Sequence, residues 1–225
     1  GDGGVAGRAG DVGAGGGVVI RLHLGSVTDL LDGSGLGAAL VHADPPWSYR
    51  NSQEGSADGH YGGRTGPDIA DHVRRAAAHA TADAYMLLWC TWPKLAEWMA
   101  QDVKPWRYIT GGSWHKTNGL GVGYHVRGDS EPWLLYGVGK PKPIGTLSNA
   151  LASPRQEHSA KPAEWLGVAF RALMPPGSTV FDLYAGLGTA AVGAQAAGMD
   201  YVGAEIDPER HGAAVDRLRQ GRMFC

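Results

Sequence analysis

The feature that most constrains the fold of this chain is a strand–turn–helix–strand pattern near its C-terminus. Residues 178–185 predict a strand, a glycine-rich turn follows, and residues 189–197 predict a helix. Residues 200–206 predict a second strand directly after that helix. Strands that are connected through a helix pair in parallel, whereas antiparallel neighbours need only a short turn. The pattern therefore predicts a parallel βαβ unit.

The rest of the chain continues the alternation of strands and helices. Further strands are predicted at residues 18–24, 36–43, 85–92, 106–114 and 133–138. Further helices are predicted at residues 68–80, 93–101, 161–173 and 208–220. This alternation predicts an α/β fold in which a mainly parallel sheet carries helices on both faces. We expect residues 18–225 to form a single domain and the glycine-rich residues 1–17 to form a flexible tail.

The composition is that of a globular protein without a strong charge. Hydrophobic residues make up 43% of the chain, charged residues make up 19%, and the formal net charge is −2, so a nucleic acid would have to bind a local patch. Cys90 and Cys225 show no metal-ligand spacing, which predicts a reducing, cytoplasmic setting and no bound metal. Since no apolar run is long enough to span a membrane, we expect no membrane partner.

The tetrapeptide Asp44-Pro45-Pro46-Trp47 follows the predicted strand 36–43 and carries the first chemical signal. The prolines fix the backbone and remove two N–H donors, so the Pro45 carbonyl can point into a cleft beside the Asp44 carboxylate. These two acceptors suit the two hydrogens of an exocyclic amino group, and Trp47 offers a ring on which a base can stack. Taken alone, the same residues could also form a rigid turn at the end of a strand.

The glycine-rich turn after the strand 178–185 carries the second signal. Gly186 and Gly188 let a ligand approach the backbone at the start of the predicted helix. Glu205 ends the next strand, where an acidic side chain can bind both hydroxyls of a ribose. A dinucleotide site would usually have a third glycine where this chain has Ala191, so the turn resembles the S-adenosylmethionine pocket of methyltransferases more closely. An ordinary turn of a βαβ unit is the alternative.

A third element between these two signals completes a resemblance to a known family. The segment His158-Ser159-Ala160-Lys161-Pro162 is similar to the His-Ser-x-Lys-Pro element of the β-class amino-methyltransferases, which have this permuted order of motifs. The chain thus resembles the adenine-N6 methyltransferases with an Asp-Pro-Pro-Trp motif, typified by the catalytic subunit of the messenger-RNA adenine methyltransferase. The resemblance is to a small bacterial or phage-like member and covers nearly the whole predicted domain.

The resemblance implies a fold, a cofactor and a set of site residues. The implied fold is a Rossmann-like S-adenosylmethionine-dependent methyltransferase domain with a mainly parallel, seven-stranded sheet. The implied catalytic residues are Asp44, Pro45, Pro46 and Trp47, and the implied substrate-binding residues are Tyr49, Lys116 and Asn118. The implied ligands of S-adenosylmethionine are Ser26, His158, Ser159, Lys161, Asp182, Tyr184, Ala185, Gly186, Gly188, Thr189, Glu205 and Ile206. In this set Glu205 would bind the ribose, Asp182 the amino group of the methionine part, and Ser26 the adenine.

The leading functional hypothesis is methyl transfer to the exocyclic N6 amine of adenine in DNA. RNA adenine and the N4 amine of DNA cytosine are alternatives, because both targets are conjugated amines on a planar ring. A catalytically silent subunit that only binds nucleic acid is a further alternative, but intact Asp44, Gly186 and Glu205 argue against it. The near-neutral charge is also compatible with a nucleoside or small-molecule substrate. The sequence leaves open whether the chain forms a homodimer or pairs with a partner subunit.

Overall fold

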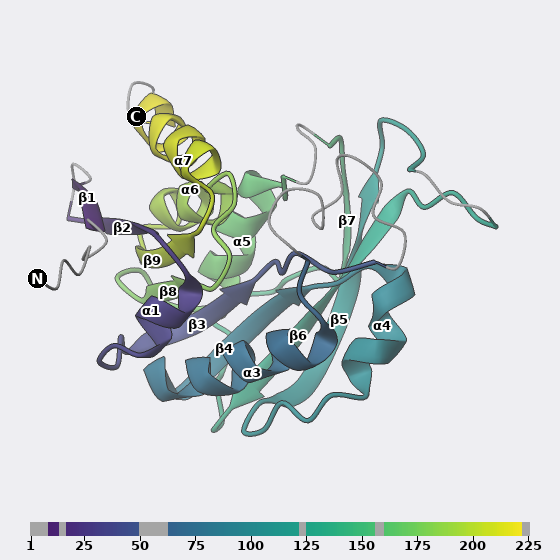
Figure 1. Cartoon of the computed structure of the whole chain (residues 1–225), viewed down its shortest axis with the longest axis horizontal. Coiled ribbons are helices and arrows are strands. Elements are labelled where there is room, and N and C mark those ends of the chain that lie inside the picture. Colours follow the sequence, from purple (N-terminus) through teal and green to yellow (C-terminus); the bar gives the residue numbers. More distant parts are fainter. Residues whose placement is uncertain (1–8, 14–16, 50–62, 122–124, 156–159, 222–225) are drawn as a thin grey trace, which may run out of the picture.

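The computed structural model describes residues 9–13, 17–49, 63–121, 125–155 and 160–221, which contain one nine-stranded sheet with helices on both faces (Figure 1). The strands are β1 (Ala9–Gly13), β2 (Val19–Leu24), β3 (Ala38–Ala43), β4 (Ala80–Trp89), β5 (Arg107–Lys116), β6 (Ser130–Val138), β7 (Ala150–Ser153), β8 (Thr179–Asp182) and β9 (Asp200–Glu205). The helices are α1 (Val27–Leu31), α3 (Gly66–Ala76), α4 (Trp92–Met99), α5 (Ala163–Leu173), α6 (Thr189–Ala196) and α7 (Pro208–Gly221), with the 3-10 turn η1 (Ala77–His79) after α3. The predicted α/β class is confirmed.

The strand order in the sheet is β1-β2-β9-β8-β3-β4-β6-β5-β7. The strands from β2 to β4 in this order are all parallel, as expected where helices connect them. β6 pairs antiparallel with both β4 and β5, and β7 pairs parallel with β5. The sheet is mainly parallel, as predicted, since five of the eight strand pairings in the described part of the chain are parallel. The predicted number of seven strands is corrected, because this part of the chain forms a mixed sheet of nine strands.

The two strands that were not predicted, β1 and β7, lie at the two edges of the sheet. β1 comes from the segment that we expected to be a flexible tail, and it pairs antiparallel with β2. The tail prediction is therefore wrong for Ala9–Gly13. A glycine-rich edge strand can pair through its backbone without an alternating pattern of side chains, so periodicity does not reveal it. β7 has only four residues, which is too short for a periodic signal.

Each face of the sheet has its own core. α5, α6 and α7 cover one face, and α1, α3 and α4 cover the other (Figure 1). In β3, Leu40 belongs to the first core and Val41 to the second, as the alternation of side chains along a strand requires. The predicted placement of helices on both faces is thus confirmed, and it leaves only the ends of the strands open to ligands.

The pairing of β3 with β8 brings the two chemical signals of the sequence together. His42 of β3 lies opposite Asp182 of β8, although 140 positions separate them in the chain. Asp44 follows β3 and the glycine turn follows β8, so both segments begin at the carboxyl ends of neighbouring parallel strands. These carboxyl ends are the usual place of ligand binding in such sheets. They are therefore the place of the candidate site.

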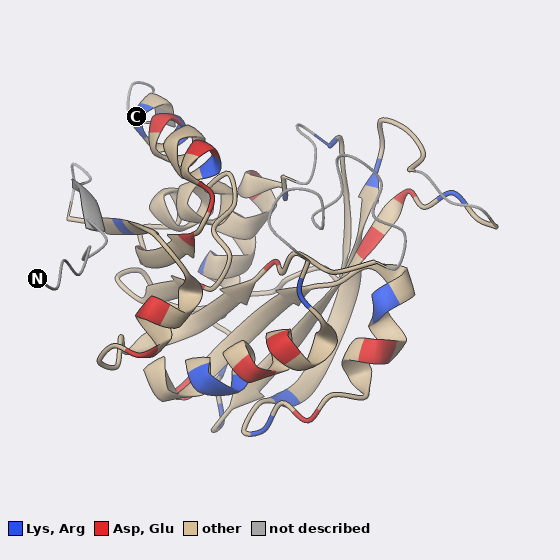
Figure 2. Ribbon diagram, in the orientation of Figure 1, with Lys and Arg blue, Asp and Glu red and all other residues tan. Residues whose placement is uncertain are grey.

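Charged side chains are spread over the molecule instead of being gathered on one face. Figure 2 shows acidic and basic residues side by side on α3, α4 and α7. None of the described helices is long and apolar enough to cross a membrane. Within the described ranges, no group of three or more His, Cys, Asp or Glu side chains could hold a metal ion. On these helices the mixed charges give no broad field of one sign that would attract a polyanion.

Candidate active site

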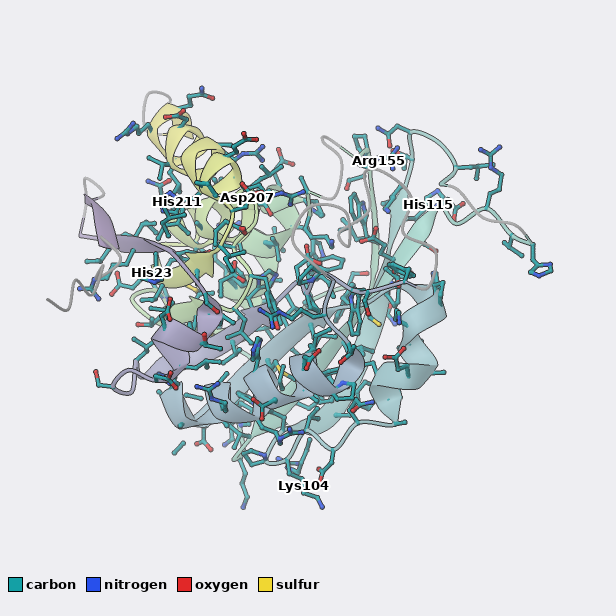
Figure 3. The ribbon with its side chains drawn as sticks, viewed as in Figure 1. His23, Lys104, His115, Arg155, Asp207 and His211 are labelled. Carbon is teal, nitrogen blue, oxygen red and sulfur yellow. The ribbon has the colours of Figure 1, made fainter. Side chains whose placement is uncertain are left out.

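Three segments at the carboxyl ends of the parallel strands carry predicted site residues. Asp44 follows β3, the turn 183–188 follows β8, and Glu205 ends β9. Because β9, β8 and β3 are neighbours in the sheet, these three places are adjacent. In Figure 3, Asp207 marks the end of the β9 segment in the upper part of the molecule, and Lys104 lies at the opposite end.

Asp44 is bound by a lysine that precedes α5. The Nζ atom of Lys161 lies 2.8 Å from each carboxylate oxygen of Asp44 and 5.5 Å from the centre of the Trp89 ring. The side chain of Lys161 is 8% exposed, and that of Asp44 is 26% exposed. Asp44 thus has an enclosed cation behind it and an open side, on which its remaining lone pairs can accept from a ligand.

The Asp44–Lys161 pair extends into a cluster of four charges. Glu131 of β6 lies 3.3 Å from Lys161, measured from Oε2 to Nζ, and its other oxygen accepts from Lys116 at the end of β5. Along the series Asp44, Lys161, Glu131 and Lys116, the charges alternate in sign. Each partly buried charge therefore has a partner of opposite sign, which offsets the cost of its burial.

Burial and neighbouring charges set the pKa values in this cluster. Burial raises the pKa of Asp44 above its ordinary value, although the charge of Lys161 opposes the change. Burial alone would lower the pKa of Lys161, but Asp44 and Glu131 outweigh it, so the pKa is raised and the lysine stays charged. Burial opposes the ionisation of Glu131, yet Lys161 and Lys116 bring its pKa below the ordinary value. Of the two carboxyl groups in the cluster, Asp44 is thus the one that accepts a proton more readily than usual.

Trp47 is buried and does not present a face for stacking. Its side chain is 5% exposed, its ring meets the Trp98 ring edge-on at a centroid distance of 5.9 Å, and its indole N–H donates to the Trp89 carbonyl at 3.3 Å. The prediction that Trp47 stacks on a base is therefore corrected, because the ring anchors the turn to the core. Tyr49 was also predicted to bind substrate, and it is 37% exposed. Tyr49 is thus more exposed than Trp47, and the Lys94 ammonium lies 5.5 Å from the centre of its ring.

The turn between β8 and α6 depends on two glycines. Gly186 and Gly188 have φ angles of +54° and +75°, which lie in the left-handed region that favours glycine. A Cβ atom on Gly188 would lie 2.8 Å from the Cβ atom of Ala214 in α7, whereas a Cβ atom on Gly186 would meet nothing within 4 Å. Gly188 therefore permits close packing, and Gly186 leaves open space over the backbone at the start of α6.

Glu205 lies beside this turn and binds its backbone. One carboxylate oxygen accepts from the Gly186 N–H at 2.7 Å, and the other accepts from the Asp207 N–H at 2.8 Å. Burial raises the pKa of Glu205, although these two hydrogen bonds oppose the change. Each oxygen keeps further acceptor capacity for a hydroxyl group. Ile206 is 54% exposed and adds an apolar surface next to the carboxylate.

Asp182 faces the interior of the protein. One of its oxygens accepts from His42 Nδ1 at 2.9 Å and from the Tyr184 N–H at 3.2 Å, and the other accepts from the Tyr201 hydroxyl at 2.8 Å. Its side chain is 1% exposed. The prediction that Asp182 binds the amino group of the cofactor is therefore corrected, because the carboxylate joins the end of β8 to β3 and β9. The hydroxyl of Tyr184 lies 2.8 Å from His72 Nδ1, which ties the turn to α3.

Three other residues that were predicted to bind the cofactor hold their own segments in place. Ser26 is the N-cap of α1, and its hydroxyl accepts from the Thr28 N–H at 3.2 Å. The Ala185 N–H donates to the Ala204 carbonyl at 2.9 Å. Thr189 is the first residue of α6 and is 8% exposed. The Ser26 bond thus fixes the start of α1, and the Ala185 bond fixes the turn to β9.

Two further predicted residues, Lys116 and Asn118, lie toward the β5 side of the site. Lys116 belongs to the charge cluster described above. The side-chain amide of Asn118 makes two hydrogen bonds with the backbone of Arg155. Its nitrogen donates to the Arg155 carbonyl at 2.7 Å, and its oxygen accepts from the Arg155 N–H at 2.9 Å. Its amide therefore fastens two segments together, which leaves less of it for a substrate than we predicted. His158 and Ser159 lie outside the described residues.

The structure adds polar residues that we did not assign to the site from the sequence. Glu131 joins the charge cluster, and His42 binds Asp182. A signal for His42 existed, because a histidine inside an apolar strand needs a buried partner. The identity of that partner could not be predicted, since it depends on which strands are neighbours in the sheet.

Comparison with known proteins bears on the fold. No protein-family model and no curated protein sequence matches the chain. TTHA0409 of Thermus thermophilus, provisionally described as a DNA modification methylase, matches with a TM-score of 0.71 and 19% identity over 90% of this chain and 96% of its own. M1.HpyAVI in complex with S-adenosylmethionine matches with a TM-score of 0.68 and 15% identity, over 88% of this chain and 100% of its own. The cytosine-N4-specific PvuII DNA methyltransferase matches with a TM-score of 0.67 and 12% identity, over 91% of each chain.

The chain shares the fold of these three proteins. All three matches extend over most of both chains, so the likeness concerns most of the domain. The candidate site lies where the parallel strands of this fold have their carboxyl ends.

Proposed function

We propose that this protein is an S-adenosylmethionine-dependent DNA methyltransferase that acts on the exocyclic N6 amine of adenine. One observation carries the proposal: the β3–β8 pairing puts the Asp44-Pro45-Pro46 turn next to the turn that contains Gly186. Methyl transfer to an amine requires acceptors for the amine hydrogens and a binding place for the methyl donor beside them. The provisionally described DNA modification methylase and the cytosine-N4-specific DNA methyltransferase among the solved structures with this fold support the same class of reaction and substrate.

The turn after β8 fits the proposed cofactor. The space over Gly186 allows a ligand to approach the backbone, Glu205 offers acceptors for ribose hydroxyls, and the exposed Ile206 offers an apolar contact for an adenine ring. M1.HpyAVI and TTHA0409 have both been crystallised with S-adenosylmethionine, which supports this ligand. When it is bound, S-adenosylmethionine supplies a methyl group that its sulfonium centre makes electrophilic.

Asp44 and the Pro45 carbonyl are the proposed acceptors of the target amine. Such an amine is a weak nucleophile, because its lone pair is conjugated with the ring. Hydrogen bonds from its two N–H groups to these acceptors favour a pyramidal nitrogen and stabilise the positive charge that develops on it. Lys161 keeps Asp44 ionised for this role, and Tyr49 offers the stacking face. The surplus proton of the product can leave through Asp44 or through solvent.

The charge distribution bears on the form of DNA that is used. A base inside a duplex has to leave the stack before its amine can reach Asp44, at a cost of a few kcal/mol. The mixed surface charges (Figure 2) and the net charge of −2 provide little non-specific attraction to repay that cost. We therefore expect unpaired or mismatched adenine to be a better substrate than fully paired adenine.

Transfer to the N4 amine of cytosine is the second candidate function. The observation that favours it is the likeness to the PvuII enzyme, which is cytosine-N4-specific. Both amines are conjugated and both have two N–H groups, so the acceptors at Asp44 and Pro45 suit either base. The choice between the two bases depends on the shape of the pocket around the ring.

Identification of the product distinguishes the candidates. The protein is incubated with labelled S-adenosylmethionine and unmethylated DNA, RNA or nucleosides, and the digested product is analysed by mass spectrometry. N6-methyladenine in DNA supports the proposal. Product found only as N4-methylcytosine establishes the second candidate, and product found only in RNA contradicts the DNA assignment. Binding of nucleic acid without any product indicates a catalytically silent subunit.

A further inference from the structure

Glu131 has no part in the chemistry proposed above, yet it binds both lysines of the site. It stands near the start of β6, and its side chain is 19% exposed. One of its oxygens accepts from Lys116, and the other lies 3.3 Å from Lys161 Nζ. A carboxylate is rarely this enclosed unless it is paired, since burial of an unpaired charge is costly. Through Lys161, which also contacts Asp44, Glu131 is connected to the proposed amine acceptor.

Lys161 is the group through which Glu131 reaches Asp44. Its ammonium has three hydrogens, and the surrounding acceptors are the two Asp44 oxygens at 2.8 Å and Glu131 at 3.3 Å. The Trp89 ring lies against the same ammonium. Because the side chain is 8% exposed, water cannot easily replace a lost partner. The position of the ammonium is therefore set by the balance between the two carboxylates.

We infer that Glu131 is a positioning residue of the amine-binding site and acts on Asp44 through Lys161. The inference rests on the proposed function, in which an ionised Asp44 accepts from the target amine. While Glu131 is present, Lys161 is shared between two carboxylates, and Asp44 keeps acceptor capacity for the amine. If Glu131 loses its charge, the ammonium is drawn onto Asp44 alone and competes with the amine for the same lone pairs.

The charges around Asp44 predict that its pKa changes in opposite directions when Glu131 or Lys116 is removed. The negative charge of Glu131 raises the pKa of Asp44, so removing this charge lowers that pKa. Removing Lys116 takes away a cation and leaves Glu131 free to attract Lys161, so it raises the pKa of Asp44. If removal of Glu131 or of Lys116 only loosened the packing, Asp44 would be less buried and its pKa would fall in both cases. Among the described residues, His42 on β3, Tyr49 in the following loop and Cys90 after β4 are further titratable side chains near the cluster.

The first test measures the protonation of Asp44 without any substrate. The full chain with its aspartate carboxyl carbons labelled with ¹³C is titrated by NMR as wild type, Glu131→Gln and Lys116→Gln. The matched control is Glu164→Gln, which removes a charge at an exposed position close to Lys161 in the sequence. We expect the pKa of Asp44 to fall in the first variant, to rise in the second and to stay unchanged in the control. Shifts in the same direction in both variants, or no shift, would overturn the inference.

The second test measures turnover with S-adenosylmethionine and unmethylated DNA. We expect kcat of Glu131→Gln to fall on the order of 10–100-fold, the usual effect of misplacing a catalytic group, here Asp44. We expect the cofactor affinity to stay unchanged and Glu131→Asp to recover part of the activity. A wild-type protein that transfers no methyl group would overturn the proposed function. An active wild type with an equally active Glu131→Gln variant would overturn this inference alone. If Glu131→Gln does not fold, the direction of the pKa shift in Lys116→Gln decides.

Discussion

Asp44 is the residue on which the proposed chemistry depends, and its protonation controls that chemistry. Its carboxylate must be ionised to accept from an amine, and burial raises its pKa above the ordinary aspartate value. A raised pKa keeps the carboxyl protonated up to a higher pH, so methyl transfer is lost below the folded-state pKa and reaches a plateau above it. We expect the acidic midpoint of the single-turnover rate to lie above about pH 4. An undiminished rate at that pH, in protein that circular dichroism shows to be folded, would contradict this role.

Glu205 is the residue that tests the proposed cofactor site. Its carboxylate lies beside the turn and has acceptor capacity for ribose hydroxyls. We expect Glu205→Ala to weaken the binding of S-adenosylmethionine by about 1.5–3 kcal/mol, the usual range for hydrogen bonds to a charged group. Isothermal titration calorimetry measures the change, and Glu209→Ala, an exposed position in the first turn of α7, is the matched control. Equal affinities of the two variants would contradict the ribose assignment.

Single residues also show where prediction from sequence reaches its limit. Asp44, Gly186 and Glu205 were predicted to share a site, and the structure brings them to one edge of the sheet. Their ligand-binding roles remain predictions. Asp182 and Trp47 were expected to face ligands, but both are buried with internal partners. Sequence order cannot reveal this difference, because the direction of a side chain after a strand depends on what packs behind it.

At the scale of the secondary-structure elements, the turn between β8 and α6 depends on the conformation of Gly188. Its φ angle is +75°, and an added Cβ atom would lie 2.8 Å from Ala214. We expect Gly188→Ala to lower the free energy of unfolding by about 1–3 kcal/mol, because a side chain is strained in this conformation.

Gly212 of α7 is the matched control for Gly188. It stands inside a helix, and an added Cβ atom would meet nothing within 4 Å. We expect Gly212→Ala to raise the free energy of unfolding by roughly 0.5–1 kcal/mol, since alanine favours a helix over glycine. Urea denaturation measures both variants. A Gly188→Ala protein as stable as the wild type would contradict the account of the turn.

The long elements were predictable because each has a strong periodic signal. β4 is an unbroken apolar run in its second half, and α3 has apolar residues on one face and a proline in its first turn. β1, β7 and the five-residue α1 were missed, because such short elements depend on neighbours that are distant in the sequence. Antiparallel pairing of β6 was missed for the same reason.

At the scale of the whole molecule, the order of strands makes one site from two distant parts of the chain. The Asp44 segment and the cofactor turn meet only when β3 and β8 are paired, so the site exists only in the folded domain. A ligand that binds this site must therefore stabilise the native state. At a concentration of about 100 times Kd, the stabilisation is about 2.7 kcal/mol.

Thermal unfolding tests this coupling between the ligand and the fold. For a domain of this size, about 1 kcal/mol shifts Tm by roughly 2–4 °C, so we expect saturating S-adenosylmethionine to raise Tm by roughly 5–10 °C. NAD at the same concentration is the control, because a dinucleotide was the rival ligand for the glycine turn. A shift with NAD and none with S-adenosylmethionine would contradict the cofactor assignment.

Methyl transfer to DNA by the wild type, Asp44→Asn and the control Asp216→Asn is the decisive test of the role proposed for Asp44. Asp216 is 69% exposed and lies on α7. Each protein is supplied with labelled S-adenosylmethionine and unmethylated DNA that contains unpaired adenine, and the product is identified by mass spectrometry. We expect N6-methyladenine from the wild type and from Asp216→Asn, and none from Asp44→Asn, although that variant still binds the cofactor. Equal product from Asp44→Asn and the wild type would contradict the account.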